Sequence, residues 1–310
     1  MADKAGGGVR SRRPRSQKQM LVSRLTPYLF LAPALLATAA VVLYPVATTL
    51  WMSLHDFVLF RPHSVPFIGL RNYERLLADE AFWISLGHSF VWVGLSVGLQ
   101  FALGLGAALI LNESFYFRSV ARALIVVPWA LPSVIIGLMF TWIYDFNLGL
   151  LNDLLLRIGW IEKPVAWLAR PDTALYAVIA TLVWQGFPFF AVTILAGLQA
   201  IPTELHEAAE IDGASRLQRF RHVVWPGLKG VILTALLLRT IWVANSLDVI
   251  LVMTGGGPGY STHTLPLYAF QRAYSGMEFG YGSALAVVLT FFLMLLALAY
   301  VRRTMRESFR

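Results

Sequence analysis

The chain has 310 residues, of which 57% are hydrophobic and only 14% are charged, and its mean hydropathy is +0.65. These values exclude a soluble globular protein and indicate a membrane protein with several spans. The absence of Cys excludes disulfides and thiol-ligated metals. A net charge of +8 would also suit a nucleic-acid-binding protein, but the basic residues lie beside apolar runs, as orientation in a membrane requires. We therefore expect membrane lipid, and no nucleic acid, as a partner.

The N-terminal residues 1–24 are rich in Gly, Ser and Arg and are expected to form a disordered basic cytoplasmic tail. The first apolar run, 27–54, is far longer than a signal-peptide core of roughly 7–15 residues. It is therefore predicted to be a retained first span, kinked at Pro33 or Pro45.

Five further runs have the length of a membrane span, which takes about 20 residues. They are 86–111, 120–144, 173–200, 229–253 and 283–301. The predicted fold class is an all-α polytopic membrane protein with six transmembrane helices. Its domains are the basic tail, a six-helix transmembrane domain over 25–301, and a second basic cytoplasmic tail over 302–310.

The distribution of Lys and Arg predicts the orientation of the spans. The two tails, the 112–122 loop and the 201–229 loop hold 17 of these residues, whereas the three loops on the other side hold 7. Because basic loops stay on the cytoplasmic side, both termini and the 201–229 loop are expected there.

Small residues and prolines mark the second and third spans. Gly94-x-x-x-Gly98 and Ala102-x-x-x-Gly106 predict close contact of the second span with another helix. Pro128 and Pro132 predict kinks in the third span.

The fourth span contains Trp184, Gln185 and Pro188, an aromatic side chain, an amide and a helix-breaking residue near mid-membrane. Lining of a substrate path is one interpretation. Packing of a Trp–Gln pair within the helix bundle is equally favoured.

The loop 201–226 is predicted to contain two short helices. Pro202 and Thr203 begin the first, which Gly213 ends, and Ser215 with Gln218 has the form of a capping box that begins the second. The first helix has small residues on one side and acidic residues on the other. On the second, an apolar stripe of Leu217, Phe220 and Val224 predicts a helix that lies along an interface.

The fifth span carries the polar stripe Arg239, Trp242, Asn245 and Asp248, with a polar residue every third position. Charges at membrane depth usually face a cavity or a partner; the alternative for Arg239 and Asp248 is a structural ion pair or an interfacial anchor. An aromatic face and an amide suit a sugar. The glycines of 254–258 predict an irregular loop, and because no Lys-Ser or Lys-Thr follows them, we expect no nucleotide site in this chain.

A spaced motif in the loop 201–226 resembles the EAA loop of membrane subunits of ATP-binding-cassette (ABC) importers. The motif is Glu207-Ala208-Ala209, three residues, Gly213, nine residues, then Val223-x-Trp225-Pro226, with Trp225 where the family usually has Leu. The run from Asp248 to Pro258 resembles the carbohydrate-permease branch that includes the maltose and glycerol-phosphate systems. The resemblance covers about 27–301.

The resemblance implies the type I ABC importer permease fold with a cytoplasmic coupling helix that docks into an ATPase cleft. The residues implied in coupling are Glu204, Glu207, Ala208, Ala209, Asp212 and Gly213. The residues expected on the substrate path are Trp184, Gln185, Trp242, Asn245 and Asp248. The implied partners are a second homologous permease subunit, two ATPase subunits that bind ATP and Mg, and an extracytoplasmic solute-binding protein, all at a bacterial cytoplasmic membrane.

Two other classes compete with this interpretation. An ion- or proton-coupled secondary transporter should have intramembrane acidic relays and internal repeats, but Asp248 is the only clear acidic candidate in a span and no repeat is found. A membrane scaffold would leave the polar stripe unexplained. Because the sequence has no nucleophile–base, paired-carboxylate or metal-ligand constellation, we expect neither catalysis nor a metal site.

Overall fold

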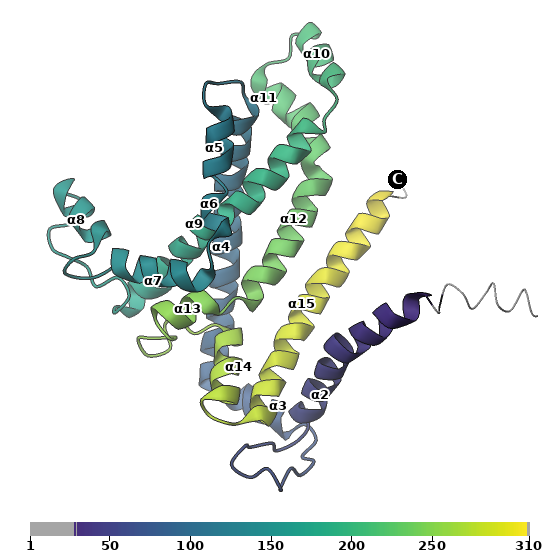
Figure 1. Ribbon diagram of the computed structural model, residues 1–310, viewed down its shortest axis with the longest axis vertical. Helices are drawn as coiled ribbons and strands as arrows, with labels where there is room; N and C mark the ends of the chain where they lie inside the picture. The colour runs from purple at the N-terminus through teal and green to yellow at the C-terminus, as the bar shows by residue number, and fades with distance from the viewer. Residues whose placement is uncertain (1–27, 29, 309–310) are drawn as a thin grey trace, which may run out of the picture. The chain divides into compact units, whose positions relative to one another are not determined.

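The computed structural model describes Tyr28 and residues 30–308, and these residues are mainly helical (Figure 1). The predicted tail 1–24 lies outside the described residues. The chain divides into two units, Met1–Trp51 and Met52–Arg310. Among the described residues, five helices are long and apolar enough to cross a membrane, and a bent helix pair could supply a sixth span. The all-helical prediction is confirmed.

The first apolar helix is described over Phe30–Ser53. It contains a π-helical turn, η1 (Ala39–Leu43), followed directly by α2 (Tyr44–Ser53). The turn ends two residues before Pro45, which has no backbone N–H to donate, so the helix departs from regular α-helical geometry beside one of the two prolines at which a kink is predicted.

The second unit contains the remaining helices. They are α3 (Arg71–Ala78), α4 (Glu80–Asn112), α5 (Arg118–Leu124), α6 (Val127–Ala130), α7 (Ser133–Ile143), α8 (Leu150–Arg157), α9 (Pro171–Gln199), α10 (Thr203–Ile211), α11 (Arg216–Arg219), the π-helical η2 (Phe220–Val224), α12 (Trp225–Asn245), α13 (Asp248–Met253), α14 (Leu265–Tyr274) and α15 (Phe279–Ser308). The helix α15 continues beyond Val301, where the sequence predicted a C-terminal tail.

The predicted third span is broken rather than gently kinked. The segments 118–130 and 133–143 meet at an angle of 94°. Leu131 is extended, with ψ 140°, and Pro132 precedes α7. A residue before proline is pushed out of the helical region, and Pro132 has no N–H to continue the helix, so the chain turns there.

The predicted fifth span also differs from a single uniform helix. The segments α11, η2 and α12 run on without a gap, so the second loop helix continues into the span instead of lying as a separate helix at an interface. The helix α12 then ends at Asn245, and Asp248 begins α13. Asp248 is therefore not on the same helix as the rest of the stripe.

The core of the second unit is formed where α4 packs against α9 and α12. Trp92 of α4 is buried and donates its indole N–H to the Val243 carbonyl at 3.0 Å, near the end of α12. At Gly104 of α4, a Cβ atom would lie 2.4 Å from the Phe190 Cβ of α9, so only Gly lets the two backbones approach this closely.

The predicted contact motifs of the second span do not make this approach. A Cβ at Gly94, Gly98 or Gly106 would meet nothing within 4 Å. Within residues 52–308 these glycines therefore make no close contact with another helix, and Gly104 makes one instead; contact through the two motifs stays a prediction.

Candidate functional site

A cavity of ≈ 490 Å³ lies among α6, α7, α9, α12 and the first residue of α13. Four of the five residues predicted on the substrate path line it, namely Gln185, Trp242, Asn245 and Asp248. The remaining lining residues are Trp129, Leu131, Pro132, Ser133, Leu182, Arg239, Ile241, Val243 and Ser246. The breaks at Pro132 and after Asn245 both fall on this lining, so irregular backbone occurs where it borders the cavity, as is typical at membrane depth.

Three polar and aromatic side chains of the lining are held by contacts with neighbouring residues. The Gln185 Nε2 donates to the Ser133 Oγ at 3.0 Å, which joins α9 to α7. The Asn245 Nδ2 donates to the Ile241 carbonyl at 2.8 Å, which leaves its Oδ1 as an acceptor. The Trp242 ring is 48% exposed and packs edge-to-face on Phe189, with ring centroids 5.3 Å apart.

Trp184, the fifth predicted residue, does not line the cavity. Its ring packs against Phe140 of α7, with centroids 5.3 Å apart. Adjacent residues of a helix point in different directions, so Gln185 and Trp184 cannot face one cavity equally. Trp184 therefore fits the alternative of bundle packing.

Arg239 lies at the buried side of the cavity and is 7% exposed. Its Nε donates to the Gln100 Oε1 at 2.6 Å, and Gln100 in turn donates its Nε2 to the Leu182 carbonyl at 2.8 Å. Among residues 30–308, Arg239 forms no ion pair. The structural ion pair with Asp248, considered as an alternative from sequence, is therefore absent, and a neutral amide of α4 is the partner instead.

The predicted coupling loop folds as two helical segments joined at Gly213, which has φ 71°. The predicted capping box is confirmed: the Ser215 Oγ accepts from the Gln218 amide, and the Gln218 Oε1 accepts from the Ser215 amide. Glu204 and Glu207 are exposed on α10. Glu210, in contrast, forms an ion pair with Arg219, so the expected acidic side is partly neutralised from within the loop.

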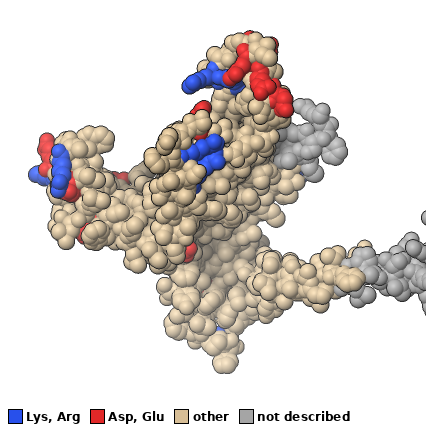
Figure 2. Space-filling model, turned by 45° about the horizontal axis from the view of Figure 1, so that its top comes forward, with Lys and Arg blue, Asp and Glu red and all other residues tan. Residues whose placement is uncertain are grey.

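A hollow of ≈ 430 Å³ lies between α10 and the segment α11–η2. Four of the predicted coupling residues, Ala208, Ala209, Asp212 and Gly213, line this hollow. Figure 2 shows acidic and basic side chains together at the end of the second unit where α10 and α11 lie. This end offers a charged surface beside a hollow bordered by small residues.

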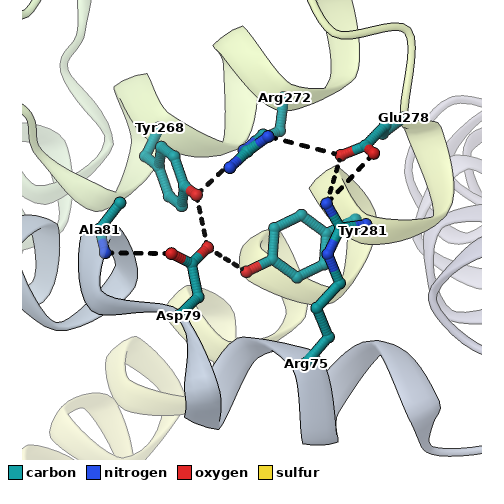
Figure 3. A network of polar contacts seen from close by, with 7 residues as sticks. All are labelled: Arg75, Asp79, Ala81, Tyr268, Arg272, Glu278 and Tyr281. Carbon is teal, nitrogen blue, oxygen red and sulfur yellow. Dashed lines mark hydrogen bonds and ion pairs between the residues drawn. The ribbon is translucent and has the colours of Figure 1, made fainter.

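A polar cluster that sequence reasoning missed joins the start of α4 to α14 and α15 (Figure 3). The Asp79 Oδ2 accepts 2.5 Å hydrogen bonds from the hydroxyls of Tyr268 and Tyr281, and its Oδ1 accepts from the Ala81 amide at 3.0 Å. Two ion pairs extend it, since both Arg75 and Arg272 lie beside Glu278, at 3.0 and 3.7 Å. We call the residues Arg75, Asp79, Tyr268, Arg272, Glu278 and Tyr281 the Asp79 cluster.

Hydrogen bonding sets the protonation of the Asp79 cluster. Burial by itself would raise the pKa of Asp79, but the hydrogen bonds from Tyr268, Tyr281 and Ala81 lower it below 3.8, so Asp79 is a carboxylate at neutral pH. Burial raises the pKa of Tyr268 to about 12, and its hydrogen bond to Asp79 acts in the same direction. Both tyrosine hydroxyls donate to one carboxylate oxygen. The sequence could not indicate this arrangement, because the tyrosines lie 189 and 202 residues from Asp79.

Some residues that line the cavity, or that lie behind Arg239, were not assigned to a site from the sequence. Gln100 interrupts an apolar run of α4, and that interruption is the signal that could have identified it. Ser133 and Trp129 have no such signal, because they border the cavity only after the chain turns at Pro132. Within the part of the chain that the structure describes, no group of His, Cys, Asp or Glu is arranged to hold a metal ion.

Comparison with known proteins identifies the family of the chain. Residues 100–307 match the family model described as "Binding-protein-dependent transport system inner membrane component". The chain is 43% identical over 268 residues to the trehalose/maltose transport system permease protein MalF of Thermococcus litoralis, covering 86% of this chain and 89% of the relative. It is 38% identical over 282 residues to the sulfoquinovosyl glycerol transport system permease protein SmoG of Agrobacterium fabrum, with 91% of each chain covered.

A solved structure supports the same fold. The bacterial alginate ABC transporter in complex with alginate pentasaccharide-bound periplasmic protein aligns with a TM-score of 0.79, at 20% identity, over 93% of this chain and 97% of the matched chain. The cavity, the helices long enough to span a membrane and the family match all point to a membrane transport subunit. The chain belongs to the binding-protein-dependent transport system inner membrane component family and is a multi-pass permease subunit of an ABC importer, in which a separate subunit hydrolyses ATP.

Proposed function

We propose that this chain forms half of the translocation path of a carbohydrate importer and that the 490 Å³ cavity is where it contacts the solute. The observation that carries the proposal is the convergence of Gln185, Trp242 and Asn245 on one cavity. Amides supply donors and acceptors for hydroxyls, and an indole face supplies flat apolar area, which together suit a sugar ring. Relatives named for trehalose/maltose and for sulfoquinovosyl glycerol support the carbohydrate class.

The complete importer consists of this chain, a second homologous permease, two ATPase subunits that bind ATP and Mg, and an extracytoplasmic solute-binding protein. The family description names binding-protein dependence, and the alginate transporter was solved with a periplasmic protein. The excess of Lys and Arg in the tails and in the 201–229 loop supports the orientation with both termini in the cytoplasm.

Replacement of both Trp242 and Asn245 by Ala tests the solute site. Uptake of the solute by vesicles that contain the importer should fall about tenfold or more, because the solute loses its contacts with one aromatic ring and one amide. Basal ATP hydrolysis should persist, since α10 is untouched. Normal uptake by the double variant would refute the site, and loss of assembly would be detected by co-isolation of the ATPase.

The segment α10, with the exposed Glu204 and Glu207 and the hollow beside Gly213, is the coupling element that docks onto an ATPase subunit. The small side chains of Ala208 and Ala209 let another backbone approach, and the exposed carboxylates suit a basic cleft. Glu210 contributes less to such docking, because Arg219 already pairs with it.

Glu207→Lys tests the coupling assignment. Reversal of an exposed charge at a docking surface places like charge against like, so solute-stimulated ATP hydrolysis should fall while the permease still inserts. Glu74→Lys, on α3 away from α10, is the matched control and should keep coupling. Unchanged coupling in Glu207→Lys would refute the docking role of α10.

A further inference from the structure

Arg239 is a buried cation whose charge the protein itself does not neutralise. It is 7% exposed, it lines the cavity, and its Nε bonds to a neutral amide oxygen of Gln100. Among the described residues, neither its Nη1 nor its Nη2 has a hydrogen-bond or ion-pair partner. A buried charge at membrane depth is costly unless it is paired, and these donors, which are not enclosed, are available to a partner that enters the cavity.

The surroundings of Arg239 hold it in place without neutralising it. Gln100 is itself fixed, because its Nε2 donates to the Leu182 carbonyl, so its Oε1 is directed at Arg239. On α9, Gly186 leaves the space that the guanidinium occupies: a Cβ there would lie 1.9 Å from the Nη2 of Arg239. Three helices therefore orient the guanidinium while using only its Nε donor.

The other polar groups of the cavity do not supply a counter-charge. Gln185 and Ser133 are neutral and bond to each other. Asp248 is the acidic residue of the lining, but it is exposed, lies beyond the end of α12 on α13, and forms no ion pair with Arg239. The cavity thus has one buried positive end and one exposed negative end.

We propose that Arg239 binds an oxyanion of the transported solute, so that the importer carries a sugar with a carboxylate, phosphate or sulfonate group. A guanidinium with two free Nη groups presents a planar fork that matches an oxyanion in a bidentate manner. This inference rests on the proposed function of the cavity as the solute site. It also orients the solute, with its anionic end at Arg239 and its hydroxyl-rich end toward Asp248.

The test compares sugars that differ only in one substituent. The neutral probe is methyl α-glucoside, and the anionic probes are methyl α-glucuronide, methyl α-glucoside 6-phosphate and methyl α-sulfoquinovoside. Binding is measured by calorimetry on the complex of both permeases and the ATPase subunits in nanodiscs, without the solute-binding protein, so that the membrane cavity alone responds. At least one anionic probe should bind about 10- to 100-fold more tightly than the neutral probe.

Three variants and one control, Arg157→Met, decide whether Arg239 causes that preference. Arg239→Met should remove it and leave binding of methyl α-glucoside within about twofold, and Arg239→Lys should keep part of it. Gln100→Glu places a carboxylate where the 2.6 Å hydrogen bond now lies, so it should remove the preference while Arg239 is still present. Arg157→Met removes the same charge from the exposed helix α8 and should keep the wild-type preference.

Two sets of results would contradict these assignments. Neutral and anionic probes that bind equally to the wild type, or a preference that survives in both Arg239→Met and Gln100→Glu, would overturn the assignment of Arg239 while the sugar site stands. Absence of binding by all four probes would overturn the sugar site and, with it, this inference. If Arg239→Met does not assemble, Gln100→Glu alone decides the question.

Discussion

The Asp79 cluster and the Arg239 cavity use charge in opposite ways. In the Asp79 cluster two carboxylates meet two arginines and two tyrosine hydroxyls, and the carboxylate of Asp79 alone accepts three hydrogen bonds. In the cavity one arginine meets a single neutral amide. Charges that satisfy one another hold helices together, whereas a charge with free donors remains available to a ligand.

Of the changes considered, the largest loss of uptake should come from filling the space at Gly186 that the Arg239 guanidinium occupies. In Gly186→Val, side-chain atoms would occupy the volume of the guanidinium and of Gln100, so both must move. Overpacking of this kind costs about 1–3 kcal/mol and should reduce uptake by more than about tenfold. Gly230→Val on α12 is the control, because a Cβ there meets nothing within 4 Å. Equal uptake by the two variants would contradict the placement of Arg239.

A smaller effect, on stability rather than on transport, is expected from the Asp79 cluster. Asp79→Ala removes the acceptor of two tyrosine hydroxyls and of the Ala81 amide, which should cost about 1–3 kcal/mol of stability. The thermal unfolding midpoint of the purified complex should fall, while probe binding at the cavity stays unchanged. Tyr281→Phe removes one of the three bonds and should lower the midpoint less. A loss of solute affinity without a change in midpoint would show that the two regions are not separate.

Lowering the pH should remove the contribution of Asp79 to stability gradually, whereas Asp79→Ala removes it completely. The pKa of Asp79 is lower in the folded protein than its ordinary value of 3.8, so its contribution is present above that value and is lost as pH falls through the folded pKa. The difference in unfolding midpoint between the wild type and Asp79→Asn should therefore be constant from neutral pH to about pH 5 and shrink below about pH 4. A difference that grows on acidification would have the wrong sign for a carboxylate stabilised by its hydrogen bonds.

The smallest effect on stability is expected from removing a solvent-exposed ion pair. Arg157 and Asp153 form an i,i+4 ion pair of 2.9 Å on α8, and both side chains are at least half exposed. Arg157→Ala should change stability by no more than about 0.5 kcal/mol, since exposed pairs gain little. The unfolding midpoint of this variant, measured beside Asp79→Ala, shows how far burial and shared hydrogen bonds separate a stabilising cluster from a solvated pair.

Much of the fold follows from sequence because its causes are local. A run of about 20 apolar residues can cross a bilayer only as a helix, so the apolar helices could be located before their packing was known. The two-segment coupling loop was also predictable, because Gly213 and the Ser215–Gln218 box act within a few residues of each other. The position of the break in the third span was predictable, because Pro132 interrupts the helix there. The angle of 94° was not, because it depends on what α7 packs against, which includes α13.

The sequence by itself determined the membrane class, the family motif and the polar stripe from Arg239 to Asp248. Only the tertiary structure decided that all four members of that stripe border one cavity, because α12 ends at Asn245, Asp248 belongs to α13, and the other walls come from α6, α7 and α9. It also decided that Gln100, 139 residues away, and not Asp248, is the partner of Arg239. A helical period places residues on one face, but pairing between distant segments is set by helix packing, and at Gly104 and Gly186 that packing depends on the absence of a single Cβ atom.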